Sequence, residues 1–134
     1  MVFYIKTWGD LLHHHHHGEE TDLFPKLEVL ANEAGIKGTP MSANVDEHRD
    51  FDQGLLQLSD YLAEIQAGSK AYDGKGVKAY IDDFGPVLTA HLHAEIATLL
   101  SLEKCDGATL KKTFNDFVAR VVKTADAVGL FQHI

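Results

Sequence analysis

The 134-residue sequence contains little cysteine, little proline and few basic side chains. Its single cysteine, Cys105, cannot form an internal disulfide, so a reducing, cytoplasmic setting is expected. No segment approaches the roughly 18 consecutive apolar residues of a membrane span, and the N-terminal stretch MVFYIKTWGDLL lacks the order of a signal peptide. With 12 basic and 20 acidic residues the net charge is −8, which argues against a nucleic-acid partner.

The remaining composition is that of an ordinary globular protein, with 45% hydrophobic and 24% charged residues. The length predicts a single domain covering residues 1–134. Gly, Pro and Asp cluster at residues 34–40, 68–76 and 105–107, where turns are expected. Between them lie four segments with apolar residues three and four apart, namely Val2–Glu33, Met41–Ala67, Val77–Leu102 and Thr109–Val128. Long amphipathic helices joined by short loops predict an all-α, antiparallel four-helix bundle.

Two prolines fall inside these predicted helices. Pro25 should kink the first helix, because proline removes one backbone hydrogen bond. Pro86 either kinks the third helix or opens a separate helix there.

Polar residues interrupt the apolar stripe on three of the four segments. Each interruption is a histidine followed four residues later by a carboxylate, in the pairs His16/Glu20, His48/Asp52 and His91/Glu95. Residues four apart share one face of a helix. A carboxylate in a bundle interior is costly unless it is paired, protonated or bound to a metal. The three pairs therefore predict one shared metal site, with mixed nitrogen and oxygen ligands that suit iron, manganese or zinc.

Five of the nine histidines are consecutive, from His13 to His17. Five adjacent residues point all round a helix, so they cannot all be ligands. His16 is in register with Glu20, whereas His15 with Glu19 is the competing register. His13 and His17 flank the same face, and His14 is expected to meet solvent or a neighbouring helix.

The string HHHHHGEETDLFP, residues 13–25, resembles the signature of the hemerythrin-like family, the HHE cation-binding domains. Two further matches follow in the family's order, Glu47-His48-Arg49-Asp50-Phe51 and His91-Leu92-His93-Ala94-Glu95-Ile96. The resemblance covers about residues 3 to 103 and is closest in style to fungal members.

This resemblance implies a non-haem di-iron site inside a four-helix bundle. It implies that Glu20 and Glu95 bridge the two irons and that His16, His48 and His91 cap them. Family members bind dioxygen reversibly, sense oxygen or iron, store metal or oxidise substrates.

Two departures from the family pattern follow from the same comparison. The family's usual first helix, with its own histidine ligand, is expected to be missing, and the C-terminal segment is a candidate to replace it. Asp52 stands where the family often has a second histidine. His13, His17 and His133 are then reserve ligands. A site with a single iron, or with zinc or manganese, becomes an alternative. The loss of a helix would also expose an apolar groove, which favours a homodimer.

The sequence thus predicts an iron protein that binds or senses dioxygen. The alternatives are an oxidase or oxygenase acting on a small organic substrate, and a protein that stores or buffers metal. No residues arranged as a catalytic nucleophile with its base are evident, so the catalytic residues are left unassigned.

Overall fold

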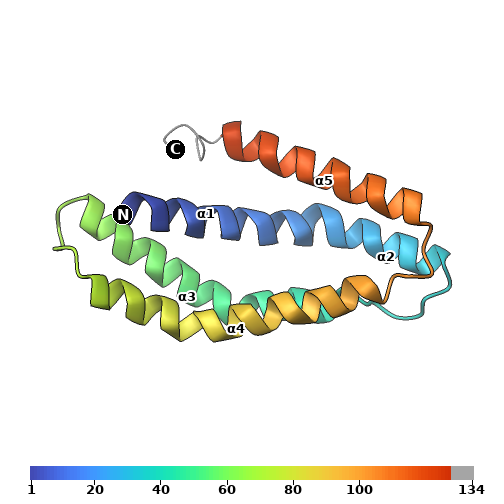
Figure 1. Ribbon diagram of the computed structural model, residues 1–134, viewed down its shortest axis with the longest axis horizontal. Helices are drawn as coiled ribbons and strands as arrows, with labels where there is room; N and C mark the ends of the chain where they lie inside the picture. Colours follow the sequence, from blue (N-terminus) through green and yellow to red (C-terminus); the bar gives the residue numbers. More distant parts are fainter. Residues whose placement is uncertain (128–134) are drawn as a thin grey trace.

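The computed structural model describes residues 1–127, and its helices run side by side along one long axis (Figure 1). In chain order the elements are α1 (Val2–Gly18), the π-helical turn η1 (Glu19–Leu23), α2 (Phe24–Glu33), α3 (Ser42–Gln66), α4 (Gly74–Leu100) and α5 (Gly107–Ala127). α1, η1 and α2 form one continuous rod, so the chain builds four rods that alternate in direction (Figure 1). The predicted all-α antiparallel bundle is confirmed.

Local signals start and stop these helices. Gly35 and Gly68 adopt positive φ angles of 76° and 74° just after α2 and α3, which is the left-handed conformation that ends a helix. Asp73 and Asp106 precede α4 and α5, and each accepts a hydrogen bond from a backbone N–H in the first helical turn. The loops are therefore short, and each helix folds back on the one before it.

The prolines affect the helices differently. Pro25 lies in the first turn of α2, directly after η1, where its missing N–H costs little. Pro86 lies inside α4, which continues without a break from Gly74 to Leu100. The alternative in which Pro86 opens a separate helix is therefore wrong.

α3 packs most extensively against α4 and also against α1, while α5 packs along α1, η1 and α2. α5 thus supplies the fourth member of the bundle beside the histidine-rich rod. α3 and α4 approach closely at Gly54, where an added Cβ atom would lie 2.8 Å from the Cβ atom of Phe84.

The apolar core has two halves. One half joins α2 to the facing ends of α3, α4 and α5, and its buried residues are Leu23, Phe24, Leu27, Ala31, Met41, Leu102, Cys105 and Phe117. The other half lies between α3 and α4, with Phe51, Leu55, Leu58, Leu62, Val77, Phe84 and Leu88. A layer of buried polar side chains separates the two halves along the bundle.

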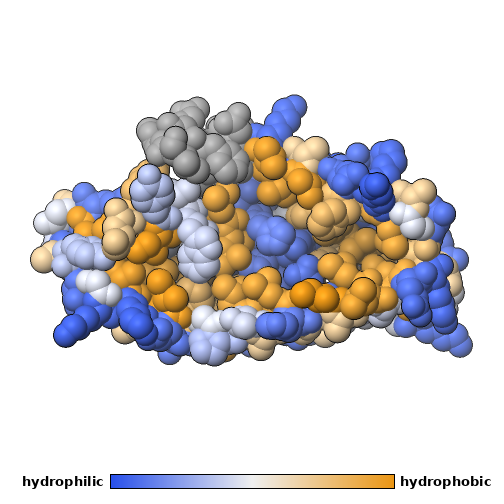
Figure 2. Space-filling model, viewed as in Figure 1, coloured by the Kyte–Doolittle hydropathy of each residue, from blue (hydrophilic) through white to orange (hydrophobic). Residues whose placement is uncertain are grey.

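The surface retains apolar side chains on α4 and α5. Figure 2 shows them gathered on the face where these two helices lie on either side of α1. The exposed apolar residues of the two helices include Leu92, Ile96, Phe114, Val118 and Val122. None of the helices described between residues 1 and 127 combines the length and apolar character that a membrane crossing requires.

Candidate metal centre

Three histidines from three helices meet in the polar layer. His16 of α1, His48 of α3 and His91 of α4 are 5%, 4% and 2% exposed, respectively. Their ring centroids lie 4.5 Å (His16 to His48), 4.6 Å (His48 to His91) and 5.4 Å (His16 to His91) apart. The three rings can each offer one nitrogen to a common point, because these ligand atoms all lie within 4.8 Å of one another.

The nitrogens that face this point have no partner. The Nε2 atoms of His16, His48 and His91 are buried without a hydrogen bond, and so is Oε2 of Glu19. Leaving a buried polar atom unsatisfied costs about 1–3 kcal/mol, so four in one place need an explanation. A cation would accept the lone pairs of the three nitrogens, and Oε2 of Glu19 lies beside them. The arrangement therefore fits a metal ion with nitrogen and oxygen ligands.

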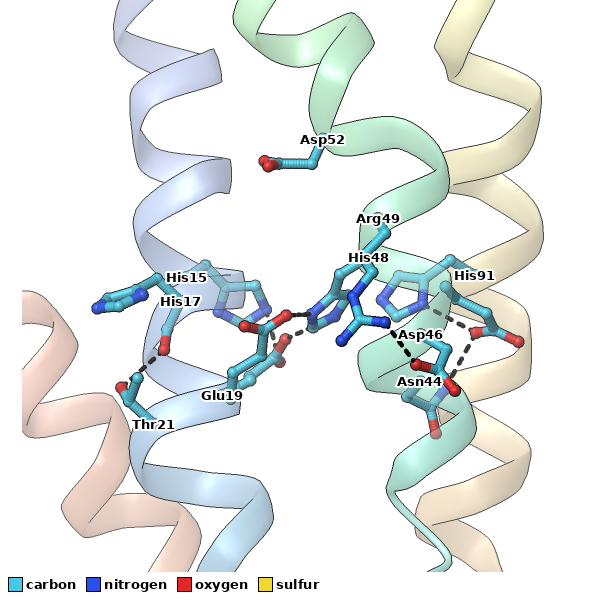
Figure 3. A network of polar contacts seen from close by, with 12 residues as sticks. His15, His17, Glu19, Thr21, Asn44, Asp46, His48, Arg49, Asp52 and His91 are labelled. Carbon is cyan, nitrogen blue, oxygen red and sulfur yellow. Dashed lines mark hydrogen bonds and ion pairs between the residues drawn. The ribbon is translucent and has the colours of Figure 1, made fainter.

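Two carboxylates hold the outer nitrogens of the rings. Nδ1 of His48 lies 2.8 Å from Oε1 of Glu20, and Nδ1 of His91 lies 3.0 Å from Oε2 of Glu47 (Figure 3). Asn44 donates a hydrogen bond to the same oxygen of Glu47. A carboxylate on Nδ1 fixes the proton there and leaves Nε2 free for a metal. The carboxylates of Glu20 and Glu47 therefore turn the Nε2 atoms of His48 and His91 toward the centre of the cluster.

A carboxylate pair adjoins the histidines on the side of α1 that carries His15. Glu19 is 1% exposed, its Oε1 lies 2.9 Å from Nε2 of His15, and its Oε2 lies 3.7 Å from Nε2 of His48. The charge of the neighbouring Glu19 acts on Glu95, whose Oε2 lies 3.9 Å from Nε2 of His91. His15, His16 and Glu19 form a second group with ligand atoms close enough for one ion.

Burial sets the protonation of this layer. Desolvation, reinforced by the neighbouring imidazole of His48, lowers the pKa of His16 to about 3. Desolvation and the charge of Glu19 raise the pKa of Glu95 to about 7. The hydrogen bond to Glu19 raises the pKa of His15. Near neutral pH, His16 is therefore an uncharged imidazole, whereas Glu95 holds a proton in a substantial fraction of the molecules.

Comparison with known proteins agrees with this donor set. The family model "Hemerythrin HHE cation binding domain" matches residues 2–102. The chain belongs to the hemerythrin HHE cation-binding family. The recognition from the histidine motifs is thereby confirmed, and cation binding through histidines and carboxylates is the property that the family name describes.

A curated relative of this HHE domain is the "Dimeric xanthone biosynthesis cluster protein R11" of the fungus Cryptosporiopsis sp. (strain 8999). It is 31% identical over all 134 residues of the chain, which spans about half (47%) of the relative's length. No solved structure matches this HHE domain significantly.

The HHE domain brings together four of its six predicted ligand residues, His16, His48, His91 and Glu95. Glu20 lies outside that group, on the outer nitrogen of His48. Asp52 lies one turn further along α3, apart from the ring cluster (Figure 3), where its Oδ1 is 3.1 Å from Nδ1 of His13. Glu19, which belongs to the alternative pair with His15, occupies the buried position instead of Glu20.

The other histidines of the HHE domain have separate partners. Nε2 of His14 lies 2.8 Å from the Thr124 hydroxyl on α5, as expected for a side chain that meets a neighbouring helix. His93 is exposed, and its Nδ1 lies 2.8 Å from the carbonyl oxygen of Thr89. The reserve ligand His133 lies outside the described residues.

Sequence reasoning missed Glu47. This residue directly precedes His48 on α3 but serves His91 of α4, and no spacing along the chain indicates that contact. The choice of Glu19 over Glu20 has a local cause, because the π-helical turn begins at Glu19 and changes the register there.

Proposed function

We propose that this HHE domain binds iron, as two ions, and through them binds or senses dioxygen. The observation that carries the proposal is the set of unpartnered Nε2 atoms on His16, His48 and His91 beside the carboxylates of Glu19 and Glu95. A neutral imidazole has one lone pair, so His16 would serve one of the two adjacent groups of ligand atoms, and a second ion would rest on the carboxylates of Glu19 and Glu95. A single iron, zinc or manganese ion is the alternative loading.

The residues divide into two roles in this proposal. His16, His48, His91, Glu19 and Glu95 hold the metal, whereas Glu20 and Glu47 orient His48 and His91 through their outer nitrogens. Iron in such a nitrogen and oxygen environment supplies the redox chemistry for binding dioxygen. Phe51, 1% exposed, covers the ring cluster, with centroids 4.9 Å from His16 and 5.3 Å from His91. It excludes bulk water from that side.

The absorption spectrum of the iron-loaded protein tests this function. We expect a new band when air is admitted to the anaerobic protein and its disappearance when oxygen is removed. His91→Ala should abolish the band and lower bound metal at least about tenfold, whereas His93→Ala, its matched control on the same helix, should change neither. An iron protein whose spectrum does not respond to oxygen would contradict the proposal.

A second candidate function is oxidation of a small organic substrate by the same iron. The specific observation in its favour is the similarity to a protein named for a dimeric xanthone biosynthesis cluster. A change in the spectrum that occurs once and leaves an oxidised product would favour this function. Stoichiometric zinc without iron in the purified protein would instead favour metal storage or buffering.

We also propose that residues 1–134 act as one domain in the cytoplasm. The exposed apolar side chains of α4 and α5 favour association of this domain as a homodimer. Sedimentation of the purified chain should give twice the monomer mass of 14.8 kDa. A monomer at all concentrations would contradict the dimer.

A further inference from the structure

A buried asparagine of α3, Asn44, contacts a carboxylate that supports the metal centre. Asn44 is only 1% exposed, and its Nδ2 donates a hydrogen bond of 3.3 Å to Oε2 of Glu47 (Figure 3). The same oxygen lies 3.0 Å from Nδ1 of His91. A chain of hydrogen bonds therefore runs from Asn44 on α3 through Glu47 to His91 on α4.

The Asn44 side chain has a polar atom that the fold leaves unpaired. A carboxylate accepts hydrogen bonds, so the NH₂ group of Asn44 must face Glu47 and its carbonyl must point elsewhere. That carbonyl oxygen, Oδ1, is buried and has no hydrogen-bond partner within residues 1–127. Burying a polar atom without a partner opposes folding. Packing alone therefore does not explain an asparagine here, since an apolar side chain would leave no atom unpaired.

The hydrogen bond to Glu47 offers an explanation. The Glu47 side chain is 34% exposed, so water competes with His91 for its oxygens. Asn44 precedes Glu47 by three residues, which places both side chains on one face of α3. Asn44 thus holds the carboxylate from its buried side and keeps Oε2 against the ring of His91.

The other supporting carboxylate, Glu20, lacks such an anchor. Its side chain is similarly exposed, at 36%, and its Oε1 lies 2.8 Å from Nδ1 of His48. Across the part of the chain that the structure describes, no second side chain donates a hydrogen bond to Glu20. Glu47 is therefore held at two points and Glu20 at one. The comparison shows that Asn44 supports the His91 side of the centre specifically.

We propose that Asn44 is a positioning residue that acts through Glu47 to hold His91 in the metal centre. Its hydrogen bond keeps Glu47 on Nδ1 of His91, which keeps the proton on that nitrogen and leaves Nε2 free for the metal. Nε2 of His91 is buried without a partner, as this role requires. The role deepens the proposed function and rests on the same metal centre.

Zinc titration and the melting temperature of the metal-free protein together test this role. Asn44→Leu removes the donor together with the unpaired Oδ1. It should lower the affinity for Zn²⁺ about three- to tenfold, while the melting temperature of the metal-free protein stays the same or rises. Asn44→Ala should lower the affinity as much, which covers the case in which leucine does not fit. A lower melting temperature with unchanged affinity would show that Asn44 only packs, and would overturn the inference.

A double-mutant cycle shows whether Asn44 acts through Glu47. Glu47→Leu alone should lower the affinity for Zn²⁺ about tenfold. Adding Asn44→Leu should then lower it no further, because the carboxylate that Asn44 holds is already gone. Fully additive effects would mean that Asn44 acts by another route, and the proposed role would be wrong. Asn115→Leu is the control, since Asn115 is an exposed asparagine on α5, and it should leave the affinity unchanged.

The imidazole nitrogens of His91 provide a direct signature. NMR of the metal-free protein should place the ring proton on Nδ1 in wild type and distribute it over both nitrogens in Asn44→Leu. An unchanged His91 spectrum in the variant would contradict the inference, even if the iron form responds to oxygen. If the iron form does not respond to oxygen but Asn44→Leu still changes this spectrum and the zinc affinity, the proposed function fails and the role of Asn44 stands.

Discussion

His16, His48 and His91 differ from the remaining described histidines in the surroundings of their Nε2 atoms. These three nitrogens are buried without a hydrogen-bond partner, whereas Nε2 of His14 lies 2.8 Å from the Thr124 hydroxyl and Nε2 of His15 lies 2.9 Å from Oε1 of Glu19. Apolar periodicity in the sequence was sufficient to identify the three, because each is in phase with the leucines of its own helix. Contacts between helices, such as that from Glu47 to His91, have no such signature in one sequence.

The neighbouring glutamates Glu19 and Glu20 should respond differently to the same substitution. Glu19→Gln replaces the buried carboxylate with a neutral amide, which is a much weaker metal ligand, so it should lower bound iron more than tenfold. Glu20→Gln keeps a hydrogen-bond acceptor for Nδ1 of His48, so it should retain the metal with an affinity about tenfold lower. Metal content after desalting measures both. If Glu20→Gln loses more iron than Glu19→Gln, then Glu20 is the ligand and the predicted pairing of His16 with Glu20 is correct.

Glu95 should make metal binding depend on pH. Its pKa is raised to about 7, so below this pH the folded protein holds a proton that a metal must displace. The affinity for Zn²⁺ should therefore rise as the pH increases from 6 to 8. His16, with a pKa near 3, is already neutral over this range and adds nothing to the rise. Glu95→Gln should flatten the curve, and a flat curve for the wild type would remove Glu95 from the ligands.

At the scale of the elements, the π-helical turn is the feature that the sequence did not reveal. The sequence favoured the register of His16 with Glu20, which assumes an unbroken α-helix through both residues. η1 begins at Glu19 and leaves that residue buried, while Glu20 is exposed and contacts Nδ1 of His48. The positions of the helices themselves were predictable, because glycine and aspartate mark their ends and the apolar spacing marks their inner faces. How α5 packs depends on contacts with α1, η1 and α2 that no local pattern encodes.

Two glycines test the helix packing in opposite directions. Gly54→Ala would place a Cβ atom 2.8 Å from Cβ of Phe84 at the α3–α4 contact, so it should destabilise the fold by about 1–3 kcal/mol. Gly107→Ala, in the first turn of α5, meets nothing within 4 Å and should stabilise by up to about 1 kcal/mol, because alanine favours a helix. Urea denaturation measures both. Equal effects of the two substitutions would contradict the close α3–α4 approach.

At the scale of the whole molecule, a polar layer divides the apolar core into two halves. Without a metal, this layer contains unpaired buried polar atoms in the middle of the bundle. A metal bound there ties α1, α3 and α4 together. Metal binding and folding stability should therefore be coupled.

Removal of the metal should lower the melting temperature. Free metal at about a thousand times its dissociation constant stabilises the folded state by about 4 kcal/mol. For a chain of this length that corresponds to a rise of at least about 8 °C. Calorimetry with and without a chelator measures the difference, and His93→Ala should show the same rise as wild type. An unchanged melting temperature would mean that no metal sits in the buried layer.

The position of the metal is the most direct measurement of the central claim. Crystals of the iron-loaded protein, measured at the iron absorption edge, should give an anomalous peak within about 2.0–2.3 Å of the Nε2 atoms of the ligating histidines among His16, His48 and His91. All three side chains should contribute ligands to the iron centre. A peak confined to the exposed histidine run, with the three buried rings unligated, would contradict it.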